Sequence, residues 1–154
     1  MRLDYQHVLP AASRAMKELE RVVESSTLEP RMRELIKLRA SQINGCAYCV
    51  DMHTKDARAM GEDPQRLDLV TAWREAPVFS PRERAALAWT ETLTLVAQAG
   101  APDDVYDDVA GLFDPVEQVV LTLAIVAING WNRLAVGFRQ PVGTYVSHRQ
   151  LVTT

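Results

Sequence analysis

Prolines divide this sequence into segments with the periodicity of α-helices. Six of them each precede a stretch in which apolar residues recur every three or four positions: Pro10, Pro30, Pro64, Pro81, Pro102 and Pro115. Proline suits the first turn of a helix, because its missing N–H would have no partner there. Ser80 and Asp114 precede two of these prolines, and each has a glutamate three residues later, which is the spacing of a capping box. With no hairpin signal and no alternating strand pattern, the sequence predicts an all-α fold of about seven helices.

The predicted helices cover most of the chain. We expect them at residues 10–25, 30–43, 45–60, 64–74, 81–99, 102–110 and from 115 onward. A chain of 154 residues corresponds to one domain, spanning residues 1–154, and its 47% apolar and 24% charged residues are ordinary for a soluble protein. The net charge of −3 and the lack of a basic stripe argue against a nucleic-acid partner.

Both cysteines and one of the three histidines lie in a single short stretch, as Cys46, Cys49 and His53. Successive helical residues step about 100° around the axis, so positions three, four and seven apart share one face. In a helix, the three side chains therefore point the same way. This spacing suits a dithiol that can close to a disulfide beside an imidazole base. Because closely spaced cysteines without an N-terminal apolar run favour intracellular chemistry, we expect a cytoplasmic protein.

Two alternatives compete with a redox-active dithiol. Cys46, Cys49 and His53 could be three ligands of a zinc ion, but closed structural sites need a fourth ligand and usually join two separated ligand pairs. No second pair occurs in this sequence, and we expect no metal and no cofactor. A static disulfide, or two inert buried cysteines, is the other alternative.

The sequence offers two ways to activate a thiol. Asn44 is a suitable N-cap, which would place Cys46 in the first turn, where the helix dipole favours a thiolate. Cys49 has His53 one turn later, and the imidazole can accept its proton. These arguments favour opposite cysteines as the nucleophile. We expect attack by Cys49 and resolution by Cys46.

Glu34, eleven intervening residues and the Cys46-x-x-Cys49-x-x-x-His53 pattern together resemble the core motif of the alkylhydroperoxidase D-like proteins. These proteins belong to the carboxymuconolactone decarboxylase superfamily. The resemblance extends from Glu34 to about Gly61 and is fainter at 80–89 and 129–134. It implies an all-α oligomer in which the dithiol reduces hydroperoxides and Glu34 and His53 form a proton relay. In the best-studied branch the residue before the second cysteine is histidine, whereas this chain has Tyr48, which we expect to be an auxiliary site residue.

The same resemblance implies a thioredoxin-like or lipoyl-bearing protein as the dithiol reductant. Two other functions fit the pattern. The chain could be a redox sensor or stress-associated oligomer whose disulfide changes its shape, or a decarboxylase or lactone-processing member of the superfamily. The last is disfavoured because those branches generally lack the cysteine pair.

The segment Val119–Ile128 is apolar except for Thr122. We expect it to be too short to span a bilayer, and we expect residues 129–133 to interrupt or end its helix. A helix that is apolar all round is buried on every side. In a small domain a second subunit would most easily cover one of those sides, so we expect a homo-oligomer, either a trimer or a hexamer. The remaining residues, 139–154, are expected to form an arm on a neighbour or a loose tail.

Overall fold

The structure, a computed structural model, describes residues 1–149, and within that range it contains helices and no strand. The all-α prediction is confirmed. The elements are α1 (Tyr5–Val8), α2 (Pro10–Glu24), α3 (Pro30–Ile43), α4 (Ala47–Ala59), α5 (Pro64–Leu69), the 3₁₀-helix η1 (Val70–Ala72), α6 (Pro81–Thr94), α7 (Val96–Ala99), α8 (Asp103–Leu112) and α9 (Pro115–Phe138).

Proline and capping residues begin the helices largely as predicted. Five helices have proline in their first turn: α2, α3, α5, α6 and α9. Both predicted capping boxes are present, at the starts of α6 and α9. The predicted helix 81–99 is wrong in one respect, because it divides into α6 and α7 at Leu95, whose φ of −105° and ψ of 20° depart from helical values. The short α1, capped by Asp4, was not predicted.

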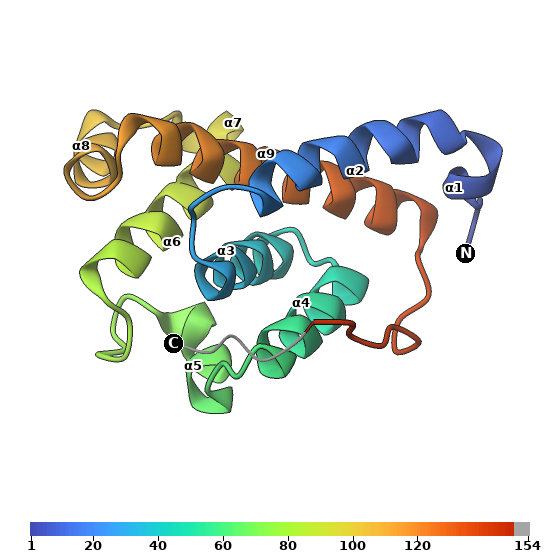
Figure 1. The fold of residues 1–154 in the computed structure, drawn as a ribbon, viewed down its shortest axis with the longest axis horizontal. Helices are drawn as coiled ribbons and strands as arrows, with labels where there is room; N and C mark the ends of the chain where they lie inside the picture. The colour runs from blue at the N-terminus through green and yellow to red at the C-terminus, as the bar shows by residue number, and fades with distance from the viewer. Residues whose placement is uncertain (150–154) are drawn as a thin grey trace.

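Helix α3 lies at the centre of the fold and packs against α4, α6 and α9. Figure 1 shows α2 and α9 side by side in one layer, with α3 and α4 in a second layer and α6 and α8 at one end. One apolar core joins α2, α6, α8 and α9 to the first half of α3, and another joins α3 and α4 to the α5–η1 region. Both long sides of α3 are therefore covered, including the side that carries Glu34.

The last helix does not end at residues 129–133, contrary to the prediction. Helix α9 continues through them to Phe138. Asn129 and Asn132 are buried, and their side chains form hydrogen bonds with neighbouring helices, so they replace solvent contacts with internal ones. A Cβ atom on Gly130 would lie 2.8 Å from Cε of Met16. Glycine at this position therefore leaves room for the end of the Met16 side chain of α2, and it does not stop the helix.

At 24 residues, α9 is longer than the apolar run that we expected to be too short for a bilayer. By length and composition it satisfies the criterion for a membrane-spanning helix, with a mean hydropathy of 1.6. Half of the apolar 18-residue stretch of α9 is buried inside the chain. Core helices of soluble proteins satisfy the same criterion. Its packing against α2, α3 and α6 accounts for the buried half.

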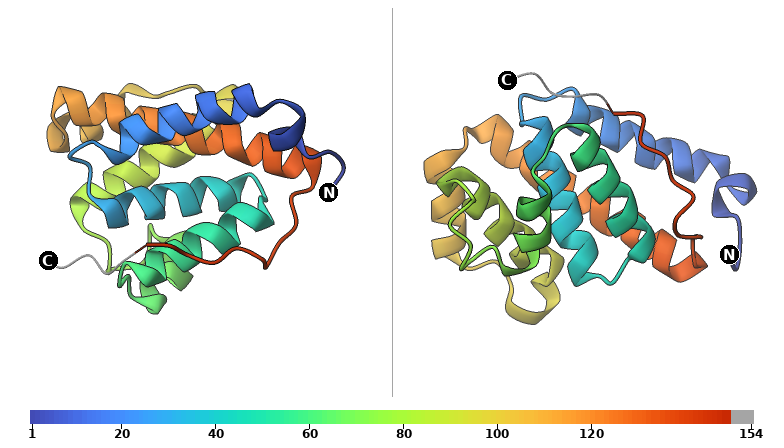
Figure 2. Two further views of the ribbon diagram at one scale, coloured as in Figure 1. Left: turned by 45° about the vertical axis from the view of Figure 1, so that its right-hand side comes forward. Right: turned by 90° about the horizontal axis from the view of Figure 1, so that it is seen from below.

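Residues 140–149 leave the end of α9 and run along α4 of the same chain (Figure 2). We call this segment the C-terminal strap. The expectation of a loose tail is wrong for these residues, because hydrogen bonds attach the strap to α4. The part of the predicted arm at 150–154 lies outside the described residues.

Candidate functional site

The two cysteines lie at the junction between α3 and α4. Helix α3 ends in a Schellman motif, in which Gly45 has φ +64° and the N–H groups of Gly45 and Cys46 donate to the carbonyls of Gln42 and Ser41. Cys46 then caps α4, and its Sγ accepts a hydrogen bond from the backbone N–H of Cys49 at 3.3 Å. Cys46 and Cys49 form a disulfide, with Cα atoms 5.4 Å apart.

The prediction that Asn44 caps the motif helix is wrong. Asn44 ends α3, because the αL glycine after it reverses the chain, and α4 begins two residues later than predicted. Its side-chain amide instead donates to the side-chain oxygens of Asn129 and Asn132, each at 2.9 Å. Asn132 also donates to Oγ of Ser41 at 3.0 Å. These contacts fasten the cysteine-bearing turn to α9.

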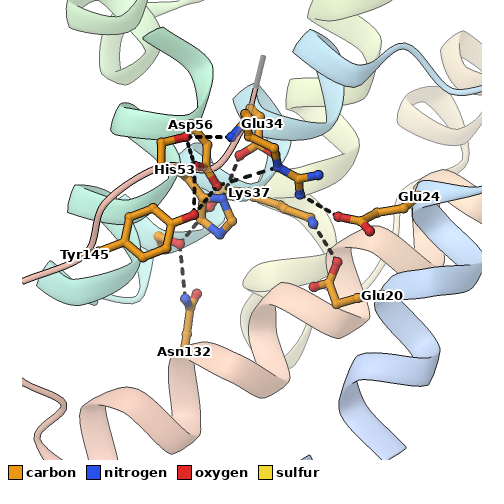
Figure 3. Close-up of polar contacts among 11 residues, drawn as sticks. Glu20, Glu24, Glu34, Lys37, His53, Asp56, Asn132 and Tyr145 are labelled. Atoms are coloured by element: carbon orange, nitrogen blue, oxygen red, sulfur yellow. Dashed lines mark hydrogen bonds and ion pairs between the residues drawn. The ribbon is translucent and has the colours of Figure 1, made fainter. Parts of the chain in front are cut away.

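Glu34 of α3 and His53 of α4 form a buried pair. Oε2 of Glu34 lies 2.7 Å from Nδ1 of His53, and the two residues are only 2% and 5% exposed. Figure 3 shows both side chains between the two helices, next to Asp56. The structure therefore brings together the glutamate and histidine that the sequence placed on separate helices.

The charge state of Glu34 fixes the tautomer of His53. Burial by itself raises the pKa of Glu34, but attraction to His53, the hydrogen bond with His53 and the nearby Lys37 together outweigh it and lower that pKa. The carboxylate is thus ionised at neutral pH and accepts from Nδ1–H of His53. In the neutral ring this leaves Nε2 as an acceptor. Nε2 is buried and has no hydrogen-bond partner among the described residues, so it is available to take a proton.

A cavity of about 350 Å³ adjoins this pair. His53 and Cys49 both line it, whereas Cys46 does not, although each cysteine is only 1% exposed. A molecule in the cavity therefore meets Cys49 and not Cys46. Tyr48 and Trp131 pack against the apolar cluster that contains both cysteines, and they also line the cavity. Burial raises the pKa of Tyr48, with nearby Tyr5, Asp51 and Asp56 adding to the effect, so its phenol stays protonated.

The sequence did not identify several other residues that line the cavity. Lys37 of α3 forms an ion pair with Glu20 of α2 at 2.5 Å, and both line the wall. Asp56 lies one turn after His53 on α4, a spacing that could have suggested its position. Tyr145 and Arg149 come from the strap, and their distance along the chain gave no signal.

In the disulfide form the two cysteines cannot serve as thiolate ligands, so this form does not match the zinc alternative. The described residues contain another cluster of metal-type ligands, Glu34, His53 and Asp56, whose ligand atoms lie within 4.8 Å of one another. Glu34 and His53 are bonded to each other, and Asp56 accepts hydrogen bonds from the strap. The hydrogen bonds of this cluster are thus explained by protein groups alone.

A helical fold with a Cys46–Cys49 pair at disulfide distance is that of the alkylhydroperoxidase D-like proteins. Residues 10–92 match the Carboxymuconolactone decarboxylase family, and the chain belongs to this family as an alkylhydroperoxidase D-like member.

Relatives and solved structures agree with this assignment. The uncharacterized protein YdfG of Bacillus subtilis is 42% identical over 135 residues, which are 88% of this chain and 92% of YdfG. A crystal structure of a protein of unknown function from Agrobacterium tumefaciens, proposed to be the antioxidant defence protein AhpD, is 48% identical. That match covers 94% of this chain and 99% of the other, with a TM-score of 0.90. An uncharacterized peroxidase-related protein from Silicibacter is 21% identical over 88% of this chain and 72% of its own, with a TM-score of 0.75, and shares the fold.

Proposed function

We propose that this protein is a dithiol peroxidase that reduces hydroperoxides through Cys49 and Cys46. One observation carries the proposal: His53, hydrogen-bonded to the buried Glu34, lines the same cavity as Cys49, and its Nε2 is available as a base. A nucleophile, a base within one helical turn and a carboxylate that orients the base are the parts of an activated nucleophile.

In the first step, His53 Nε2 accepts the proton of the Cys49 thiol, and the Glu34 carboxylate stabilises the resulting imidazolium. The thiolate attacks the terminal oxygen of a hydroperoxide. The S–O bond forms as the O–O bond breaks, and the departing alkoxide takes the proton from His53 to leave as an alcohol. Cys49 becomes a sulfenic acid, having supplied the two electrons.

In the second step, the Cys46 thiolate attacks the sulfenic sulfur of Cys49 and forms the disulfide, and the departing hydroxide takes up the proton that the Cys46 thiol released and leaves as water. The position of Cys46 at the N-terminus of α4 favours its thiolate. A dithiol reductant, which we expect to be a thioredoxin-like or lipoyl-bearing protein, resets the pair by exchange and is itself oxidised to a disulfide. Tyr48 remains protonated in this cycle and can donate a hydrogen bond to the peroxide, at the position where the related branch has histidine.

The test is steady-state peroxide consumption by the purified protein, with dithiothreitol or a protein dithiol as reductant. We expect multiple turnovers with the wild-type protein, and we expect none with Cys49→Ser. Without reductant, Cys46→Ser should consume one equivalent of peroxide and stop at the sulfenic acid, because it lacks the resolving thiol. A single turnover by the wild-type protein in excess reductant would favour a redox sensor and would contradict the proposed enzyme.

A further inference from the structure

The C-terminal strap is attached to α4 and α2, the two helices that flank the cavity. Nζ of Lys55, on α4, donates to the backbone carbonyl oxygen of Tyr145 at 3.0 Å. The guanidinium of Arg149 forms an ion pair with Glu24, near the end of α2. Because Glu24, Tyr145 and Arg149 all line the cavity, the strap forms one of its walls.

Asp56 is the main attachment point of the strap. Its carboxylate, in a residue only 4% exposed, accepts from the Tyr145 hydroxyl at 2.8 Å and from the Ser147 hydroxyl at 2.6 Å (Figure 3). Nε of Arg149 lies 3.9 Å from the same carboxylate. A buried carboxylate that lost these donors would bear an uncompensated desolvation cost. The buried charge of Asp56 and the closed position of the strap therefore stabilise each other.

The Tyr145 side chain lines the cavity but does not act as a proton donor to a substrate. Its hydroxyl lies within 2.8 and 3.1 Å of the two Asp56 oxygens, so its proton is already donated. Burial and the contact with Asp56 raise the pKa of Tyr145 far above neutrality. The strap therefore contributes the bulk of a phenol ring and a guanidinium to the cavity, held in fixed positions.

We propose that Tyr145 and Arg149 are specificity-determining residues, which limit the size of the molecules that reach Cys49, and that Asp56 is their positioning residue. This inference concerns the same cavity as the proposed peroxidase function and rests on that function for its biological meaning. It predicts that loosening the strap admits larger reagents to Cys49 while access for small ones changes little.

The first experiment needs no enzymatic activity. In a Cys46→Ser background, Cys49 is the single thiol, and its reaction rate is measured with N-ethylmaleimide and with the larger N-(1-pyrenyl)maleimide. We expect Tyr145→Ala to raise the ratio of the pyrenylmaleimide rate to the N-ethylmaleimide rate by at least about tenfold, the lower end of the discrimination by size in a hydrophobic pocket. Arg149→Ala should raise it less, since this side chain is half-exposed.

Two further variants distinguish the effect of the Tyr145 ring from the effect of the hydrogen bonds that hold the strap to Asp56. Tyr145→Phe combined with Ser147→Ala keeps the ring but removes both hydroxyl donors to Asp56, and we expect an intermediate rise in the ratio. Tyr106→Ala is the control, because Tyr106 is bonded to Gln118 away from the strap. Melting temperatures verify that each variant is folded. If Tyr145→Ala does not fold, the double variant Tyr145→Phe/Ser147→Ala supplies the test. An unchanged ratio in the folded strap variants, or an equal rise in Tyr106→Ala, would overturn the inference.

The second experiment links the strap to the reaction and keeps Cys46. The ratio of kcat/KM for cumene hydroperoxide to that for hydrogen peroxide should rise in Tyr145→Ala and stay constant in Tyr106→Ala. Absence of turnover in every variant would overturn the proposed peroxidase function, while the maleimide ratio would still decide the role of the strap. A maleimide ratio that rises without any change in the peroxide ratio would overturn the specificity role.

Discussion

At the residue scale, the buried pair of Glu34 and His53 controls the protonation of the site. Glu34 is ionised because its interactions with His53 and Lys37 overcome the burial that would keep it neutral. Its carboxylate holds the Nδ1 proton of His53, so the opposite nitrogen is the one that can accept a proton from a thiol. A base oriented in this way can raise the thiolate fraction of Cys49 near neutral pH, because an adjacent imidazolium lowers a cysteine pKa.

We predict that His53→Gln raises the apparent pKa for alkylation of Cys49 and lowers peroxidase turnover by at least about tenfold, within the usual range of general acid–base catalysis. The measurement is the pH dependence of the iodoacetamide reaction in a Cys46→Ser background. His7→Gln is the matched control, since His7 is exposed on α1. An alkylation profile that His53→Gln leaves unchanged would remove the histidine from the mechanism and leave the helix terminus as the activator.

The lowered pKa of Glu34 also predicts a pH-dependent stability. Since the folded pKa lies below the unfolded value of about 4.3, ionised Glu34 stabilises the fold above that pH, and the contribution is lost as pH falls through the folded pKa. At pH 7, we expect Glu34→Gln to reduce the free energy of unfolding by about 1–3 kcal/mol. The difference from wild type should shrink below about pH 4.

Urea unfolding at a series of pH values measures this effect, with Glu18→Gln as the control. Glu18 is 65% exposed at its side chain and pairs with Arg21 on the surface, so its replacement should change stability little at any pH. A difference between wild type and Glu34→Gln that stays constant from pH 7 to pH 3 would contradict the assignment of an ionised Glu34.

The sequence singled out Glu34, Cys49 and His53 as candidate site residues, but it did not identify Lys37, Asp56 or the residues of the strap. Cys49 and His53 lie one turn apart on α4 and share a face by local spacing alone. Glu34 needed the family resemblance, because periodicity alone does not show that both sides of α3 are covered. Tyr145 is separated from Asp56 by 89 residues, and its contact depends on the path of an irregular segment. Such a path leaves no periodic pattern in the sequence.

At the element scale, helix starts marked by proline were predictable, and the junction of α3 and α4 was not. Asn44 suits the start of a helix, and glycine suits the position just after a helix ends. The glycine decided the outcome here, because the αL conformation of Gly45 completes two hydrogen bonds to the end of α3. Cys46 then took the capping position. The same motif at Gly61, with φ +84°, ends α4 as the sequence predicted.

We therefore predict opposite effects for two glycine-to-alanine substitutions. Gly45→Ala has open space for its Cβ, so its cost comes from the positive φ alone and should be about 1–2 kcal/mol of stability. Gly111 lies within α8, also with open space and without a positive φ, and Gly111→Ala should stabilise the protein by about 0.5–1 kcal/mol. Urea unfolding of the reduced proteins measures both changes. If Gly45→Ala were as stable as wild type, the turn between α3 and α4 would tolerate a side chain at this position.

At the scale of the whole molecule, an apolar stripe remains uncovered along α8 and α9. Its large side chains recur at helical spacing and are 40–68% exposed, as Leu112, Val116, Val119 and Val126. Within one chain α9 is therefore not buried on every side, and the expectation that a second subunit covers the remaining side stays a prediction. The sequence showed that α9 is apolar on all sides. Which side remains exposed depends on how α2, α3 and α6 pack against the other sides.

The final prediction is that a second copy of the chain covers this stripe. Burying a valine side chain gains about 1.5–3 kcal/mol, so several together favour association. Light scattering at micromolar concentration should give a multiple of the monomer mass, and we expect three or six subunits. Replacing Val119 and Val126, which are 58% and 52% exposed, by lysine should dissociate the assembly, because an apolar interface would then contain unpaired charges. Val146→Lys, at a 70% exposed position on the strap, should leave the mass unchanged. A wild-type monomer at this concentration would contradict the prediction.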